Sequence, residues 1–288
     1  MTRLFLILFL FLRTPALAQP GTEIYLFDLS IKKKSVTLSN PVNITNRKGY
    51  DNQPSFHPDE ELLYYVAADT AGESDIVVYD LKKRTSKAFT DSPEREYSPA
   101  LTPDKKFISA ILQRSNGAQD LVRYPVGDGN AEILISNLIC GYYAFMNSEV
   151  VGVFALPAPF TLHLINLKTR SDTVIADSIG RSLHKVQNAM ALSFIEKKGP
   201  SAFIRTWDIA KKQLLTIGKA VPGREYDMAW APGGLLLMSD GSKLFCQWPD
   251  KAASEWREVK TDGIFPSGGV TRIAVNPAGT KVAVVISE

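Results

Sequence analysis

Histidine and cysteine are scarce in this 288-residue sequence, which has three histidines and two cysteines. Two cysteines cannot form the several bridges that stabilise small disulfide-rich secreted domains. The histidines, His57, His163 and His184, fall far apart along the chain, and no HExxH, CxxC or EF-hand spacing occurs. We therefore expect neither a metal site nor any other cofactor.

An excess of positive charge is also missing. The chain has 33 basic and 30 acidic residues, and without its first 18 residues, which include Arg3 and Arg13, it would have 31 basic residues. Nucleic-acid-binding proteins normally gather a basic excess on one face. The sequence thus predicts no nucleic-acid partner.

No apolar run is long enough to cross a membrane, which takes about 20 residues. The longest, Leu4–Leu12, covers nine residues; a positive start, Met1–Arg3, precedes it, and a small-x-small site, Ala16-Leu17-Ala18, follows it. This order is typical of a secretory signal peptide. We expect cleavage near Gln19, a periplasmic or secreted protein, and no membrane insertion after residues 1–18 are removed.

A repeat is what the sequence does contain. Six times, a short apolar strand with a large side chain near its end runs into a polar turn, and the gaps between these side chains are 52, 45, 41, 42 and 41 residues. Four units also carry a proline turn upstream, at Pro58, Pro103, Pro232 and Pro277. A four-stranded unit that recurs every 41–45 residues is typical of a β-propeller. The large side chains are those of Phe27, Tyr79, Tyr124, Ile165, Trp207 and Trp248.

The two chain ends predict how the ring closes. The chain opens on a third strand, Glu23–Leu29, and a fourth, Ser35–Leu38; it finishes on a first strand, Thr271–Asn276, and a second, Lys281–Ser287. Pairing the two halves completes the first blade and leaves no open apolar face. We predict an all-β, six-bladed propeller of four-stranded antiparallel blades over residues 19–288.

Cys140 and Cys246 could pair in an oxidising compartment, or they could be two small buried side chains. They fall in units two apart in the predicted ring, beyond the Cα separation of about 7 Å that a disulfide tolerates. We predict two free thiols.

The segments Pro54–Asp59, Asp75–Leu81 and Ala88–Thr90 resemble the PD-type, WD-like repeat of TolB-like propellers. The resemblance covers nearly the whole chain after residue 18, and it is weakest over residues 141–176 and 183–218, which lack the proline turn. TolB itself has an additional α/β domain before its propeller, and here we expect the propeller alone. The resemblance implies a fold that serves many functions.

Two identical triplets, Arg95-Glu96-Tyr97 and Arg224-Glu225-Tyr226, each lead into a predicted innermost strand. They lie 129 residues apart, which is three units, so a six-bladed ring places them opposite each other. Arg47, Arg181 and His184 fall near the same point of other units. These nine residues form our predicted ligand site, because arginine and tyrosine are enriched in binding hot spots. The alternative is that the charges only pair with neighbouring loops, as exposed ion pairs of little energetic weight.

No catalytic residue is predicted, because the sequence has no Gly-x-Ser-x-Gly elbow. We expect a monomeric, non-enzymatic module that binds a protein, peptide or glycan partner of the cell envelope at one mouth of the channel. A propeller-type hydrolase or lyase is one alternative, and a purely structural part of an envelope complex is another. Two carboxylates that converge with a Tyr or His in a closed pocket would favour the enzyme, whereas a wide aromatic funnel of mixed charge would favour binding.

Overall fold

The computed structural model describes residues 20–32, 35–69, 72–127, 129–222, 227–249, 255–262 and 265–288. The predicted signal peptide, residues 1–18, lies outside these ranges. The described residues form 25 strands and one short 3-10 helix, Pro232–Gly234. Among the described residues, no helix is long and apolar enough to cross a lipid bilayer. The predicted all-β class is confirmed.

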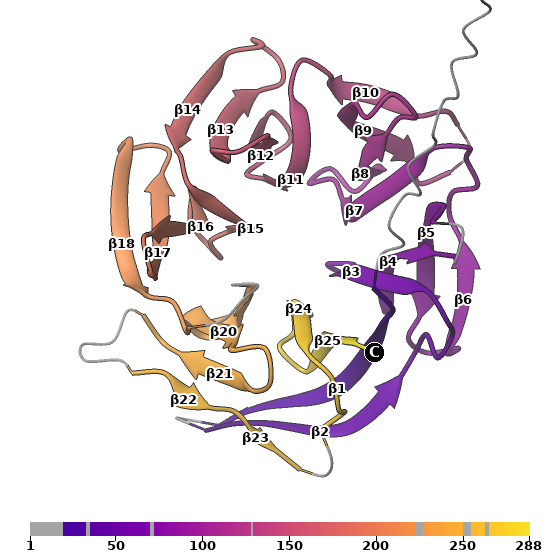
Figure 1. Cartoon of the computed structure of the whole chain (residues 1–288), viewed down its shortest axis with the longest axis vertical. Helices are drawn as coiled ribbons and strands as arrows, with labels where there is room; N and C mark the ends of the chain where they lie inside the picture. The colour runs from indigo at the N-terminus through magenta and orange to yellow at the C-terminus, as the bar shows by residue number, and fades with distance from the viewer. Residues whose placement is uncertain are drawn as a thin grey trace, which may run out of the picture.

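Four separate sheets, each of four antiparallel strands, lie around a common centre (Figure 1). Each sheet follows chain order, so the first strand is innermost and the last is outermost. Their strands are β7 (Arg95–Leu101), β8 (Phe107–Gln113), β9 (Gln119–Pro125) and β10 (Glu132–Ile135); β11 (Ile139–Phe145), β12 (Val150–Leu156), β13 (Thr161–Asn166) and β14 (Asp172–Ala176); β15 (Ile179–Lys185), β16 (Ala191–Lys198), β17 (Ser201–Asp208) and β18 (Gln213–Lys219); and β19 (Met228–Ala231), β20 (Leu235–Ser239), β21 (Leu244–Gln247) and β22 (Arg257–Glu258).

The remaining strands form one nine-stranded sheet where the sequence predicts two separate blades. One antiparallel run is β24-β25-β1-β2 and the other is β3-β4-β5-β6, and a single parallel bridge between Thr22 and Tyr50 joins them. The short strand β23 adds to β2. The strands are β1 (Thr22–Lys32), β2 (Ser35–Asn43), β3 (Tyr50–Phe56), β4 (Leu62–Ala68), β5 (Ser74–Asp80), β6 (Thr85–Ala88), β23 (Lys260–Thr261), β24 (Val270–Val275) and β25 (Lys281–Ser287).

The predicted pairing of the two chain ends is present. β1 pairs antiparallel with β25 from Thr22 opposite Ser287 to Asp28 opposite Lys281. The last of these pairs also forms an ion pair, with Nζ 2.5 Å from Oδ1. The C-terminal segment therefore completes a sheet that the N-terminal segment begins.

The core lies between neighbouring sheets, so the second strand of each sheet is buried on both faces. This is why β12 and β20 read as almost continuous apolar runs without the polar alternation of a half-exposed strand. Phe194 on β16 is fully buried against residues of the neighbouring sheet, including Phe154. Gly152 on β12 lets Leu192 of β16 pack closely against it, since a Cβ atom there would lie 2.5 Å from Leu192 Cδ2. Outer strands such as β6 are exposed.

The prediction for the two cysteines is confirmed. Cys140 on β11 and Cys246 on β21 are buried and free. Burial raises the pKa of the Cys140 thiol to about 12, so this side chain is a protonated, small apolar group at neutral pH.

Candidate functional site

A bulge interrupts five of the innermost strands. The register of the pairing with the second strand shifts in β3, β7, β11, β15 and β24. In β3 and β7, Gln53 and Ser98 take a left-handed backbone, with φ of 55° and 53°, and a proline that needs no ladder hydrogen bond follows each. Because a bulge breaks the simple alternation of a strand, these segments present extra side chains to the centre of the ring.

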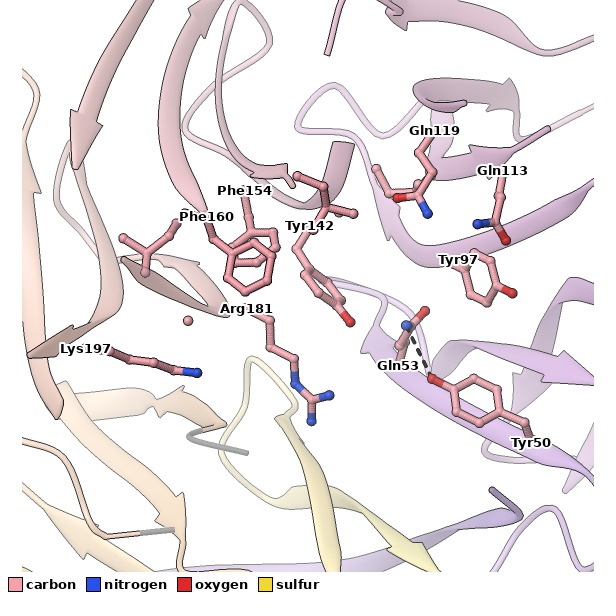
Figure 2. A pocket seen from close by; sticks show the side chains of 15 residues that line it. Tyr50, Gln53, Tyr97, Gln113, Gln119, Tyr142, Phe154, Phe160, Arg181 and Lys197 are labelled. Carbon is pink, nitrogen blue, oxygen red and sulfur yellow. Dashed lines mark hydrogen bonds between the residues drawn. The ribbon is translucent and has the colours of Figure 1, made fainter. Parts of the chain in front are cut away.

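A pocket of about 400 Å³ lies at the end of the channel where the innermost strands begin (Figure 2). We call it the mouth pocket. Its walls combine aromatic, amide and cationic side chains, and among the lining residues that the structure describes none is Asp or Glu. The side chains that define it are those of Tyr50, Gln53, Tyr97, Gln113, Gln119, Tyr142, Phe154, Phe160, Arg181 and Lys197.

The polar groups of the mouth pocket offer both hydrogen-bond donors and acceptors at neutral pH. Burial raises the pKa of Tyr50 to about 12, which keeps its hydroxyl protonated. Gln53 Nε2 donates to that hydroxyl at 3.5 Å, and its Oε1 accepts from the Ser98 N–H at 2.5 Å. Arg181 Nη2 donates to the carbonyl of Thr271 at 2.8 Å, which ties β15 to β24. The site is therefore built from several sheets and depends on the closed ring.

Two further cavities continue the mouth pocket along the channel. A mid-channel cavity of about 150 Å³ shares Gln53, Tyr142 and Arg181 with it, and a far cavity of about 310 Å³ shares His184 and Ile273 with the mid-channel cavity. The far cavity also includes residues near the ends of β3, β15 and β24, so the three spaces follow the inner strands from start to end.

Arg272 and Asp227 are the charged pair of the mid-channel cavity that the sequence analysis missed. The side chains are 11% and 7% exposed, and Arg272 Nη1 lies 3.7 Å from Asp227 Oδ1. Asp227 Oδ2 also accepts from the Ile273 N–H at 2.8 Å. The Arg272 guanidinium lies over the Tyr142 ring, 4.7 Å from its centroid. Burial acts to lower the pKa of Arg272, but Tyr142 and Asp227 outweigh it, so the side chain stays charged.

The structure separates the members of the first triplet. Tyr97 lines the mouth pocket, and Arg95 lines a neighbouring groove of about 470 Å³ that shares Gln113 with it. Glu96, predicted as part of the ligand site, has 0% exposure and lines neither of these two spaces. Its carboxylate accepts from the hydroxyls of Ser92 at 2.5 Å, Tyr124 at 2.9 Å and Thr90 at 3.3 Å.

Glu96 gives the protein a measurable pH dependence. Burial raises its pKa to about 6, above the ordinary value of 4.5. The folded state therefore holds the proton more tightly, and the free energy of unfolding should fall as pH rises from 4.5 to 6 and then level off. From the approximate worth of one pKa unit, we expect this fall to be roughly 1–2 kcal/mol.

Glu96→Gln should remove the contribution of Glu96 to the fall in the free energy of unfolding with rising pH. Urea unfolding from pH 4.5 to 7.5 measures this. Asp51, whose pKa burial also raises to about 6, contributes in the same direction and remains in the variant. The quantity to compare is therefore the difference in the free energy of unfolding between Glu96→Gln and the unaltered protein at each pH. An unchanged difference across the range would contradict the role of Glu96.

The other predicted site residues divide in the same way. Arg181 lines the mouth pocket, and His184 lines the mid-channel cavity, where burial lowers its pKa and keeps it neutral at pH 7. Arg47 does not line the pocket; its Nη2 pairs with Asp51 Oδ1 at 2.6 Å and donates to the Ala68 carbonyl. The second triplet, Arg224-Glu225-Tyr226, lies outside the described residues.

The remaining histidines have structural contacts. His57 is only 9% exposed, and its Nδ1 accepts from the N–H groups of Asp59 and Glu60. His163 on β13 lies 2.9 Å from the Asp172 carboxylate. Within the described ranges, no group of three or more His, Cys, Asp or Glu side chains is placed to hold a metal ion.

Most of the mouth pocket was not predicted. Gln113 and Lys197 lie at or near the ends of second strands, Phe160 lies in the loop that follows one, and Gln119 begins a third strand. In an antiparallel blade the second strand returns to the end where the first began, so this position in each repeat was the signal that could have found them.

Comparison with known proteins rests on structure, since no protein-family model and no curated protein matches the sequence. A putative TolB from Agrobacterium tumefaciens superposes with a TM-score of 0.71 at 12% identity, over 94% of this chain and 99% of that chain. The chain has a TolB-type β-propeller fold. TolB from Acinetobacter baumannii gives 0.59 at 11%, over 93% and 65% of the two chains, and a chain of a nidogen/laminin complex gives 0.55 at 10%, over 88% and 82%. Identities this low show the fold alone.

Proposed function

We propose that this protein is an exported binding module, without enzymatic activity, that holds a protein or peptide partner of the cell envelope in its mouth pocket. The observation that carries the proposal is the pocket's lining. Phenols, amides and the cations of Arg181 and Lys197 surround a space of about 400 Å³, with no carboxylate among the described lining residues. Such a lining suits a partner that carries negative charge and backbone-like hydrogen-bonding groups.

The lining favours binding over hydrolysis or lyase chemistry. Paired-carboxylate catalysis needs two acidic side chains that converge on the substrate. Among the described residues that line the mouth pocket and the mid-channel cavity, Asp227 is the one acidic residue, and its carboxylate is engaged by the Ile273 N–H and Arg272. The amides of the pocket have no nucleophilic or acid–base function at neutral pH.

We infer further that the ring has six blades and that the mature protein is a monomer. In support of six blades, the nine-stranded sheet consists of two antiparallel runs of four that a single bridge joins, with the short strand β23 added to β2. The six copies of the sequence repeat agree with this count. Export rests on the signal-peptide pattern of residues 1–18.

Arg181→Gln combined with Lys197→Gln tests the proposal. We expect the double variant to capture at least ten-fold less of its partner from envelope extracts, a loss of about 1.4 kcal/mol, because both cations leave the pocket. Capture is measured with immobilised protein at several salt concentrations, followed by quantitative mass spectrometry of the retained material.

A double variant of matched charge, Arg170→Gln with Lys198→Gln, is the control. Arg170 lies in the turn between β13 and β14, and Lys198 follows Lys197 on β16 but does not line the pocket. The control should retain the partner as the unaltered protein does. Equal capture by both double variants would show that the mouth pocket is not the binding site.

A further inference from the structure

One wall of the mouth pocket comes from the β7–β10 sheet and is polar. Gln113 at the end of β8 pairs directly with Gln119 at the start of β9, so their side chains lie next to each other on one face of the sheet. Tyr97 lies on the same face, one step deeper, opposite Ile111. The side chains of Gln113, Gln119 and Tyr97 all line the pocket and are half-buried.

The polar groups of this wall are free to bind a ligand. Within the described part of the chain, the amides of Gln113 and Gln119 and the hydroxyl of Tyr97 make no hydrogen bond. Gln53 differs, because its amide is held by the Tyr50 hydroxyl and the Ser98 N–H. A carboxamide can both donate and accept, and a ligand that supplies the same hydrogen bonds replaces the water around it. The two free amides therefore mark a position for a group that donates and accepts.

A second wall of the mouth pocket comes from the next sheet and is apolar. Leu156 at the end of β12 and Phe160 in the loop after it are half-buried, and both line the pocket. Figure 2 shows Phe154 and Phe160 on one side of the pocket and Gln113 and Gln119 on another. An apolar side chain that lies against Leu156 and Phe160 is removed from water, which favours binding.

We propose that the partner segment held in the mouth pocket is an extended peptide with a large apolar residue, leucine or phenylalanine, at its centre. That side chain lies against Leu156 and Phe160, and the peptide groups beside it hydrogen-bond to the amides of Gln113 and Gln119. The proposal rests on the proposed function and identifies which chemistry of the partner the pocket recognises.

The spacing of the two amides suits a peptide backbone. Neighbouring strands lie about 4.8 Å apart, and successive Cα atoms of a peptide are about 3.8 Å apart. Two glutamine side chains on adjacent strands can therefore reach two successive peptide groups of one chain. The volume of about 400 Å³ lies within the range of roughly 300–1,000 Å³ that is usual for pockets that bury a small ligand.

The apolar wall favours a side chain over a sugar ring. A sugar ring binds by lying flat on an exposed aromatic face, but Phe154 is only 4% exposed, and Phe160 packs on it with ring centroids 4.9 Å apart. Leu156 has no ring at all. A branched or aromatic side chain can fill such an irregular surface, because its burial needs no particular orientation.

The test uses a series of uncharged peptides, acetyl-Gly-Gly-X-Gly-Gly-amide, in which X is leucine, phenylalanine, alanine or serine. Without charge on the peptide, attraction to Arg181 and Lys197 does not decide the result. Binding is measured by NMR titration of isotope-labelled protein, which follows weak as well as tight binding. We expect the leucine or the phenylalanine peptide to bind at least ten-fold more tightly than the serine peptide.

Gln113→Met with Gln119→Met removes both amides and keeps the length of the side chains. We expect this double variant to bind the preferred peptide at least ten-fold more weakly and to melt within a few degrees of the unaltered protein. The matched control is Gln187→Met with Gln213→Met, which changes two glutamines outside the mouth pocket and should leave binding unchanged.

Phe160→Ala tests the apolar wall and should reduce the preference for leucine or phenylalanine over serine. If this variant does not fold, the preference of the unaltered protein within the peptide series still tests the wall. Equal binding of all four peptides would refute the apolar subsite. Binding that persists without Gln113 and Gln119 amides would refute the recognition of peptide groups.

These failures differ from a failure of the proposed function. If no peptide of the series binds, yet capture of envelope material still depends on Arg181 and Lys197, the mouth pocket binds a partner but not by this chemistry. Chitobiose, whose acetamide groups offer the same hydrogen bonds as a peptide, is the remaining probe. Binding of chitobiose that requires Gln113 and Gln119, without binding of any peptide, would overturn the proposal in favour of a glycan.

Discussion

A protein that lacks residues 270–288 is expected to be insoluble, or to unfold without a cooperative transition. The deletion removes β24 and β25, and with them the strand that pairs along β1. Six aliphatic side chains that are at most 4% exposed are lost: those of Val270, Ile273, Val282, Val284, Val285 and Ile286. Each contributes about 1.5–3 kcal/mol by its burial, so together they contribute roughly 9–18 kcal/mol, which is as large as the total of about 5–15 kcal/mol that stabilises a typical domain.

The deletion also exposes side chains of β1 that pack against β25 in the complete protein. Phe27 and Ile24 on β1 are at most 1% exposed, and they pack in the clusters to which β25 contributes. Their exposure would give an apolar face on both sides of the gap and promote aggregation. Soluble yield and thermal unfolding followed by circular dichroism measure the effect, with removal of Glu288 alone as the control. A truncated protein that melts cooperatively near the full-length temperature would contradict the closure by β25.

Phe194→Ala is expected to lower the free energy of unfolding by about 3–5 kcal/mol, the usual cost of removing a fully buried aromatic side chain. Phe194 has 0% exposure and lies in the cluster that joins the β11–β14 and β15–β18 sheets. The rigid second strands on either side, which meet at Gly152 and Leu192, leave little freedom to fill the cavity. Urea unfolding with a constant m-value measures the change.

Phe160→Ala is the matched comparison. Phe160 belongs to the same cluster but is only partly buried, because it also forms a wall of the mouth pocket. We expect a clearly smaller loss of stability than for Phe194→Ala, together with weaker partner capture. If Phe160→Ala destabilised the protein as much as Phe194→Ala and left capture unchanged, the aromatic wall would be part of the core and not of the binding site.

The bulges of the innermost strands explain why the site could only partly be predicted. Period-two alternation assigns residues to the two faces of a strand, and a bulge shifts that assignment by one residue from its position onward. Tyr97 and Arg181 were recognised because they lie where the inner strands begin. Glu96, the neighbour of Tyr97, was assigned to the same mouth but is buried in a network of hydroxyl groups.

The sequence by itself determined the all-β class, the four-stranded repeat, the pairing of the chain ends and the free cysteines. These features depend on local patterns of apolar residues and turns, and on their spacing along the chain, which can be read without knowing what lies opposite each side chain. Only the tertiary structure decided that Thr22 and Tyr50 join two runs of strands into one sheet. It also decided that Arg181 reaches the Thr271 carbonyl, 90 positions away, and that Arg272 lies over the Tyr142 ring and beside Asp227. Such contacts form when the ring closes and brings distant repeats to one axis, and no local pattern records which of their side chains meet there.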